Sequence, residues 1–153
     1  MANQFMHLEK IYIVGASAAA DVDTISEVAA LTTNDLGDLK GSPFAKVTFD
    51  PKSINTQNGD KTLGKNAKVE ISALILPNDT IAATMRALEG TKVVAFCVPK
   101  GTVGAGNPIV VIKNWLLQIK GEFNIGEASF LTFYNDNVPI LDETDIFGTP
   151  ITS

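Results

Sequence analysis

Residues 115–123 read Trp-Leu-Leu-Gln-Ile-Lys-Gly-Glu-Phe, and this stretch carries the clearest periodicity in the chain. Large apolar side chains alternate with polar ones along it. One side carries Trp115, Leu117, Ile119 and Phe123, and the other carries Asn114, Gln118, Lys120 and Glu122. Successive side chains of a β-strand point to opposite faces of its sheet. The alternation therefore predicts a strand over residues 115–123, with one face in a core and the other in water.

The segments on either side of this strand also predict β-structure. A short turn at residues 125–127 leads to a second strand over residues 129–134, so the pair is expected to form an antiparallel hairpin. Upstream, residues 92–98 are apolar on both faces, which is typical of a central strand covered on each side. Residues 99–108, with three glycines, are expected to form a loop.

A helix is predicted over residues 78–89. Asn78 or Asp79 can cap its first turn, where acidic charge suits the positive end of the helix dipole. The apolar stripe expected to face the sheet consists of Ile81, Met85 and Leu88. Gly90 then supplies a C-terminal stop.

A long polar segment, residues 50–68, separates a strand at residues 46–49 from an alternating strand at residues 69–76. A connection of this length is unusual in a compact domain. Asn58-Gly59 favours a type I′ turn, because both residues tolerate the positive φ that this turn requires. The segment is therefore predicted to be a protruding hairpin arm.

The two ends of the chain are less regular. Residues 8–14 predict a short strand, whereas residues 24–31 have apolar positions compatible with either a helix or an extended segment. Residues 135–153 are rich in acidic residues and proline, so we expect an extended tail.

These elements predict a mainly β fold with one flanking α-helix, built as an antiparallel β-sandwich or barrel with a long protruding hairpin arm. At 153 residues and 45% hydrophobic content, the chain fits one domain over residues 1–153. The expected parts are an N-terminal segment (1–45), a β core (46–134) that includes the arm (50–68) and the helix (78–89), and a C-terminal tail (135–153).

Composition excludes several classes of function. The net charge is −5, so the chain lacks the excess of lysine and arginine with which proteins bind nucleic-acid phosphates. An acidic surface would instead repel DNA and let it pass without binding. Cys97 is the only cysteine, so neither an intramolecular disulfide nor a cysteine zinc cage can form. We expect no export signal, and no apolar run approaches the roughly 20 residues that span a bilayer.

Few residues are candidates for chemistry, and each has a simpler interpretation. His7 has no nearby ligand or triad partner and reads as a surface histidine. Cys97 lies in an apolar strand and reads as core packing. The stretch from Val14 to Ala20 begins like a dinucleotide-binding turn but contains only the first glycine of that motif. We therefore expect no enzyme, no cofactor and no metal ligand.

Two further clusters have similar interpretations. The loop containing Gly101, Gly104 and Gly106 lacks the Lys-Ser/Thr ending and the following helix of a phosphate-binding loop. The acidic cluster of Asp142, Glu143 and Asp145 has no EF-hand spacing, so a solvated or partner-facing tail is expected.

The order of elements over residues 46–134 is strand, polar arm, strand, capped helix, buried strand, glycine loop and antiparallel hairpin. This order resembles the tail tube proteins of long-tailed bacteriophages and the related tubes of contractile injection systems. The resemblance implies a virion structural protein that forms stacked hexameric rings around a DNA channel. It also implies assembly in the bacterial host cytoplasm, with other phage tail or head-tail proteins as partners.

In such a tube, the arm would join successive rings. The resemblance then implies that the stacking residues are Asn58, Asp60, Lys61, Lys65 and Lys68. Two alternatives stay open from the sequence. One is a capsid decoration or head-tail joining protein of a phage, and the other is a ligand-binding α/β domain whose site would lie at Gly15.

Overall fold

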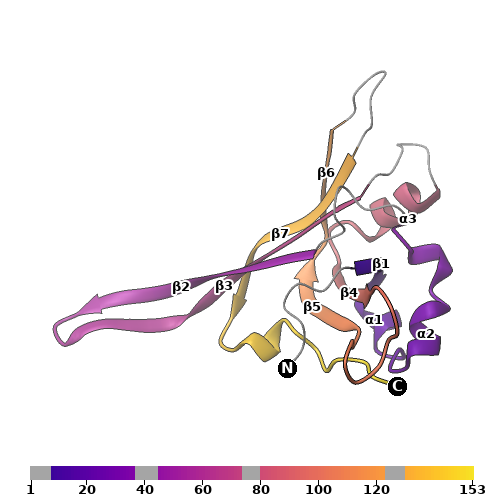
Figure 1. Ribbon diagram of the computed structural model, residues 1–153. Coiled ribbons are helices and arrows are strands. Elements are labelled where there is room, and N and C mark those ends of the chain that lie inside the picture. Colours follow the sequence, from indigo (N-terminus) through magenta and orange to yellow (C-terminus); the bar gives the residue numbers. More distant parts are fainter. Residues whose placement is uncertain (1–7, 37–44, 74–79, 123–129) are drawn as a thin grey trace.

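The computed structural model describes residues 8–36, 45–73, 80–122 and 130–153, with side chains described except at 52–55, 60–63, 73, 122 and 130. The fold is mainly β, with two antiparallel sheets and few helices (Figure 1). The predicted fold class is therefore confirmed.

The first sheet has three strands in the order β1-β4-β5. The strands are β1 (Leu8–Gly15), β4 (Lys92–Pro99) and β5 (Val110–Leu116). The predicted central strand is β4, which is buried from Val93 to Cys97 because it has a neighbour on each edge and a core on each face. Residues 100–108 form the loop that the glycines predicted.

The second sheet has four strands in the order β2-β3-β7-β6. The strands are β2 (Ala45–Thr56), β3 (Gly59–Ala73), β6 (Gln118–Glu122) and β7 (Phe130–Ile140). Strands β6 and β7 pair antiparallel, which confirms the predicted hairpin, although its turn lies outside the described residues. Ile71, Phe133 and Ile119 stand side by side in register and form an apolar row toward the core.

The strand predicted over residues 115–123 is divided between the two sheets. β5 ends at Leu116 and β6 begins at Gln118, so a single continuous strand was the wrong prediction. At the junction, the Leu117 N–H donates to the Thr91 carbonyl and the Leu117 carbonyl accepts from the Gly90 N–H. The predicted inward face is correct nevertheless, since Trp115 and Leu117 are fully buried.

Two apolar clusters form the interior. The larger lies between the sheets, where Trp115 from β5 and Phe133 from β7 belong to the same buried cluster. The smaller covers the other face of the first sheet, with Tyr12 and Phe96 beneath the helices α1 (Ala16–Ala19) and α2 (Ile25–Ala29). The molecule is thus a two-sheet sandwich with a further layer over the first sheet.

The predicted flanking helix is α3 (Thr80–Leu88), and the residues proposed to cap it, Asn78 and Asp79, lie outside the described residues. Met85 and Ala82 are buried against the larger cluster. Gly90 has a φ of 84°, the left-handed conformation that the predicted stop requires. Of the two possibilities for residues 24–31, the structure has a helix, α2, capped by the Thr24 side chain.

The predicted extended tail over residues 135–153 is wrong. β7 continues to Ile140, and the chain then turns through η2 (Glu143–Asp145) and packs along β5. Ile146 and Ile151 are buried, because isolated bridges hold this segment at Ile112 of β5 and at Ile109, just before β5. The acidic residues that suggested a solvated tail lie in the tight turn between these apolar anchors.

Candidate functional site: the arm and the sheet edges

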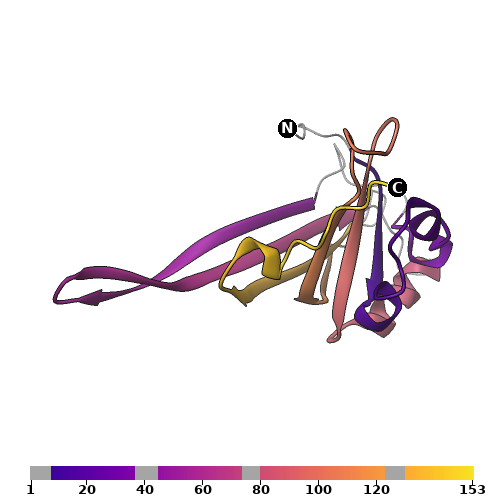
Figure 2. The same ribbon diagram turned by 90° about the horizontal axis from the view of Figure 1, so that it is seen from below.

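The predicted arm is a hairpin that projects from the body of the molecule (Figures 1 and 2). β2 and β3 pair from Ala45 opposite Ile71 to Thr56 opposite Gly59. β7 flanks β3 only as far as Lys65, which pairs with Ile140. The distal hairpin therefore continues as two strands without the third that supports its root.

The tip has a different geometry from the predicted type I′ turn. Gly59 has a φ of 101°, but Asn114 is the only described non-glycine residue with positive φ, so Asn58 lacks the conformation that type I′ requires. The Asn58 N–H donates to the Thr56 hydroxyl, which donates in turn to the Gly59 carbonyl. The tip is closed by a left-handed glycine after the turn, as in hairpins with a glycine bulge.

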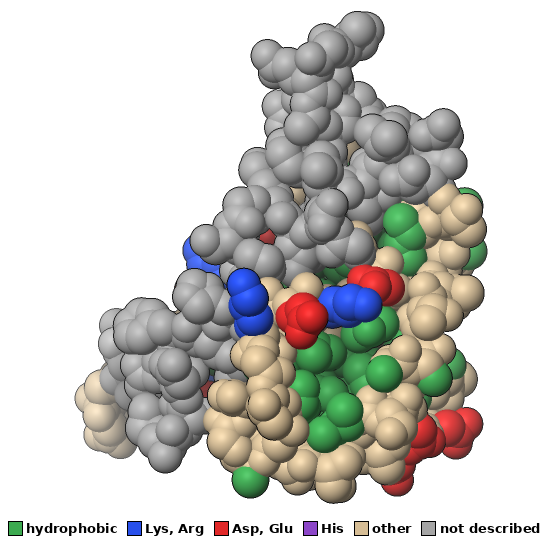
Figure 3. Space-filling model, turned by 45° about the vertical axis from the view of Figure 1, so that its right-hand side comes forward, with side chains coloured by type: hydrophobic (Ala, Val, Ile, Leu, Met, Phe, Trp, Pro, Cys, Tyr) green, Lys and Arg blue, Asp and Glu red, His purple; other side chains and the backbone are tan. Residues whose placement is uncertain are grey.

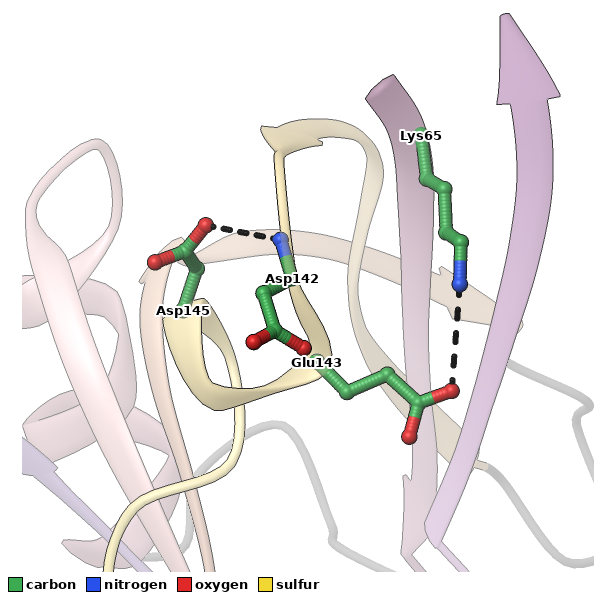
Figure 4. Close-up of polar contacts among 4 residues, drawn as sticks. All are labelled: Lys65, Asp142, Glu143 and Asp145. Atoms are coloured by element: carbon green, nitrogen blue, oxygen red, sulfur yellow. Dashed lines mark hydrogen bonds and ion pairs between the residues drawn. The ribbon is translucent and has the colours of Figure 1, made fainter. Parts of the chain in front are cut away.

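The root of the arm is fastened to the C-terminal segment (Figure 4). Lys65 Nζ lies 3.9 Å from a carboxylate oxygen of Glu143 and 5.8 Å from the centroid of the Phe49 ring. The Phe49 ring packs edge-on against Phe147, with centroids 6.1 Å apart. A charged contact and an aromatic contact thus join both arm strands to the segment after β7.

The acidic cluster has a structural role in this turn. The Asp145 carboxylate accepts from the backbone N–H groups of Leu141, at 2.9 Å, and Asp142, at 3.1 Å. These two bonds lower the pKa of Asp145. Asp142 and Asp145 form a reciprocal capping box that holds η2, and Glu143 is left to reach Lys65.

Of the five residues assigned to ring stacking, Asn58 lies in the turn at the tip and the other four are spread along β3. Asn58 is exposed at the tip, and Asp60 and Lys61 stand opposite Asn55 and Ile54, with side chains outside the described set. Lys65 is engaged with Glu143 at the root. Lys68 is 54% exposed, with its Nζ 3.9 Å from Asp50.

Both outer edges of the first sheet are covered. On β1, the Ile11 carbonyl accepts from the Leu36 N–H and the Ile13 carbonyl accepts from the Asn34 side chain, at 2.8 Å. On β5, the Lys113 N–H donates to the Ile146 carbonyl at 2.7 Å. Unpaired strand edges invite pairing with another chain, and here short segments of the same chain occupy them.

The second sheet is different. Its edge strands are β2 and β6. On β6, the Ile119 N–H donates to the Glu89 carboxylate at 3.1 Å. On the outer side of β2, no described strand pairs with residues 45–56. Pro51, which has no N–H to donate, interrupts this edge.

The remaining candidates are placed in structural roles or lie outside the described set. Burial raises the pKa of Cys97 to about 12, and the thiol packs in the larger cluster as predicted. β1 pairs antiparallel with β4, so Gly15 does not open a parallel βαβ unit. His7 lies outside the described residues. Within the described chain, no group of His, Cys, Asp and Glu could hold a metal, and no helix is long and apolar enough to cross a membrane.

Comparison of the sequence with protein-family models and with curated proteins gives no match. Among the described residues, the arm and the outer edge of β2, with which no described strand pairs, are the features on which a function can be argued.

The sequence did not predict the clamp at the root of the arm, which consists of the Lys65–Glu143 ion pair and the Phe49–Phe147 ring contact. Lys65 was assigned to a contact between subunits, yet Glu143 is its neighbour in the same chain. The pairing depends on β7 lying beside β3, which brings residues 65 and 143 together across a long sequence separation. The local signal that could have indicated it is the alternation of Val138 and Ile140, which marks residues 135–140 as a strand.

Proposed function

We propose that this protein is a self-assembling structural subunit of a virion, a tail tube protein whose copies form stacked hexameric rings around a channel that conducts DNA. The observation that carries the proposal is the arm. Beyond Lys65 it is an isolated two-stranded hairpin, and such hairpins are marginally stable in water. A neighbouring copy would supply the support that the distal hairpin does not receive from any third described strand.

The outer edge of β2, with which no described strand pairs, supports the same proposal. β2 and β6 terminate the same sheet at opposite sides. If the β2 edge of one copy pairs beside the β6 edge of the next, the contact is heterologous, and such contacts close into rings when the rotation permits. Ring closure would pair the outer edge of β2, with which no described strand of the single chain pairs.

The outward face of the second sheet is compatible with an aqueous channel. Lys46, Glu70, Tyr134 and Gln118 stand side by side in register across the four strands. Lys120 Nζ lies 4.8 Å from the centroid of the Tyr134 ring in the same face. Charges of both signs on this face, on a chain of net charge −5, would not bind a passing phosphate backbone tightly.

Negative-stain electron microscopy and sedimentation velocity on the purified full chain test the proposal. Rings or tubes are expected as the concentration rises. Trimers, or a single ring that never stacks, would instead favour a capsid decoration or head-tail joining protein. A chain that stays monomeric up to its solubility limit would contradict assembly altogether.

A further inference from the structure

The tip of the arm carries the one Asn-Gly pair in the sequence, Asn58-Gly59. Asn58 lies in the turn, Gly59 begins β3 opposite Thr56, and both are exposed. Asparagine has a side-chain carbonyl carbon that the backbone nitrogen of the next residue can attack. Glycine obstructs this attack less than any other residue, because it has no Cβ.

The space around these two residues is open. A Cβ added at Gly59 would have nothing within 4 Å, whereas one added at Gly64, nearer the root, would lie 2.9 Å from the Ile140 carbonyl oxygen. On the helical side of the body, Figure 3 shows hydrophobic side chains gathered in one area. The tip residues, Gln57 to Gly59, have no apolar side chain that would draw them onto such a surface. Water therefore reaches the side-chain amide of Asn58.

Asn58 is held in the turn by its backbone. Its N–H donates to the Thr56 hydroxyl at 3.3 Å. Among the hydrogen bonds of the described residues, none involves the Asn58 side-chain amide. The amides of Asn107 and Asn114, by contrast, donate to backbone carbonyls at 3.2 Å and 2.7 Å. The Asn58 side chain can therefore rotate toward the nitrogen of the next residue.

The attack also requires the turn to open briefly, so that the Asn58 side-chain carbon and the Gly59 nitrogen come into contact. Beyond Lys65 the arm consists of two strands alone, and an isolated two-stranded hairpin is marginally stable. Gly59, with a φ of 101°, is in a conformation that glycine leaves and enters without a steric penalty. Local opening of the tip therefore costs far less free energy than global unfolding.

We propose that Asn58 is a modification site, at which the chain deamidates spontaneously. The Gly59 nitrogen loses its proton and forms a bond to Asn58 Cγ, while the side-chain nitrogen takes up a proton and leaves as ammonia. Water then opens the cyclic imide at one of its two carbonyl carbons. Opening at Cγ gives aspartate, and opening at the backbone carbonyl carbon gives isoaspartate. The net change replaces ammonia by water and requires neither an oxidant nor an enzyme.

The two products change the tip in different ways. Aspartate adds a negative charge beside Asp60. Isoaspartate adds the same charge and also carries the backbone through Cβ and Cγ, so the turn becomes longer by one carbon. The Thr56 hydroxyl binds the Asn58 N–H on one side of this bond and the Gly59 carbonyl on the other, so this closure of the tip should be lost. The site does not rest on the proposed assembly.

Peptide mass spectrometry of the aged, folded full chain tests the site. The protein is kept dilute, so that the proposed rings do not form, at neutral and at mildly alkaline pH. Trypsin then releases residues 53–61 as one peptide, and fragmentation separates Asn58 from Asn55. Deamidation at Asn58 should grow with time and run faster at the alkaline pH, because the attacking nitrogen must lose its proton. Isoaspartate identifies the cyclic route, since direct hydrolysis of the amide gives aspartate alone.

The chain contains two internal controls. Asn137 is also exposed, but the β-branched Val138 follows it, so its deamidation should be at least tenfold slower. Asn107 precedes Pro108, which has no N–H to lose, so it should form no imide by this route. Asn58→Gln keeps the amide but would have to close a six-membered ring, and it should also be at least tenfold slower.

Three results would overturn the site. They are a rate at Asn58 no higher than that at Asn137, aspartate as the only product, and a rate in the folded chain more than a hundredfold below that in the urea-unfolded chain. The last result would mean that the turn holds Asn58 and Gly59 apart. If Asn58 stays intact in a protein that forms rings, the modification site is wrong and the assembly function stands. If Asn58 deamidates in a chain that never assembles, the reverse holds.

Discussion

Lys65 stands opposite Ile140 in the last pairing between β3 and β7, and beyond this pair the arm continues as two strands alone. The pair marks the boundary between the part of β3 that belongs to the four-stranded sheet and the part that projects from it. Assembly contacts and folding contacts can therefore be altered separately on either side of Lys65.

Replacing residues 52–64 by Asn-Gly should leave the fold intact and block stacking. The change keeps the register of Pro51 opposite Lys65, as well as the contact of Lys65 with Glu143. A deletion that included Lys65 would instead damage the clamp. The expected result is a monomer with a thermal midpoint within a few degrees of wild type, measured by calorimetry, and no stacked species. Loss of the folded monomer would contradict a peripheral arm.

Gly64→Ala should destabilise the protein more than Gly59→Ala. Both glycines have positive φ, 114° and 101°, so each substitution places a side chain in the left-handed region at a cost of about 1–2 kcal/mol. At Gly64, the new Cβ would also lie 2.9 Å from the Ile140 carbonyl oxygen, whereas nothing lies within 4 Å at Gly59. Urea unfolding of the two variants measures the difference. Equal losses would mean that β7 does not lie against β3 at this point.

Trp115→Ala should destabilise the protein by about 3–5 kcal/mol, because the side chain is 0% exposed and its removal leaves a cavity between the sheets. The indole N–H also donates to the Ile112 carbonyl at 3.2 Å. Trp115→Phe keeps most of the apolar volume and should cost less. Chemical denaturation checks both variants, and a near-neutral alanine variant would place Trp115 outside the core.

The comparison of Trp115 with Leu117 shows what local periodicity can predict. Alternation correctly predicted that both side chains are buried, because burial depends on the face of the strand. It could not predict that the first sheet ends at Leu116 and that the chain enters the second sheet at Gln118, since that depends on β4 and β7 as partners. No glycine or proline marks the change at Leu117.

The arm was predicted correctly and the tail wrongly, and the difference lies in whether the structure of the segment depends on residues far away in the sequence. The arm was predictable because a long polar segment between two strands has few other structures available to it. The tail was predicted wrongly because Ile146 and Ile151 are too far apart to form a strand or helix pattern. Their burial comes from packing along β5 and Ile109, about 30 to 40 residues earlier in the sequence.

Ile146→Ala should destabilise the protein by about 2–5 kcal/mol, since the side chain is fully buried in the larger cluster. Leu141→Ala is the matched control in the same segment, because Leu141 is 82% exposed and its loss should be nearly neutral. Thermal unfolding of both variants compares them. Similar midpoints would restore the extended tail that the sequence predicted.

Cys97 should make the stability fall at alkaline pH. Burial raises the pKa of its thiol from 9.0 to about 12, so between these values the unfolded chain loses a proton that the folded chain retains. The unfolded state then binds fewer protons, and the free energy of unfolding decreases as pH rises. Urea unfolding between pH 8 and pH 10 should show this slope in the wild type and a shallower one in Cys97→Ala, which removes the titrating group.

The native thiol should also react with a thiol reagent only on unfolding. Rapid labelling of the folded protein would mean that β4 is accessible at its centre and that the two-sided burial of this strand is incomplete.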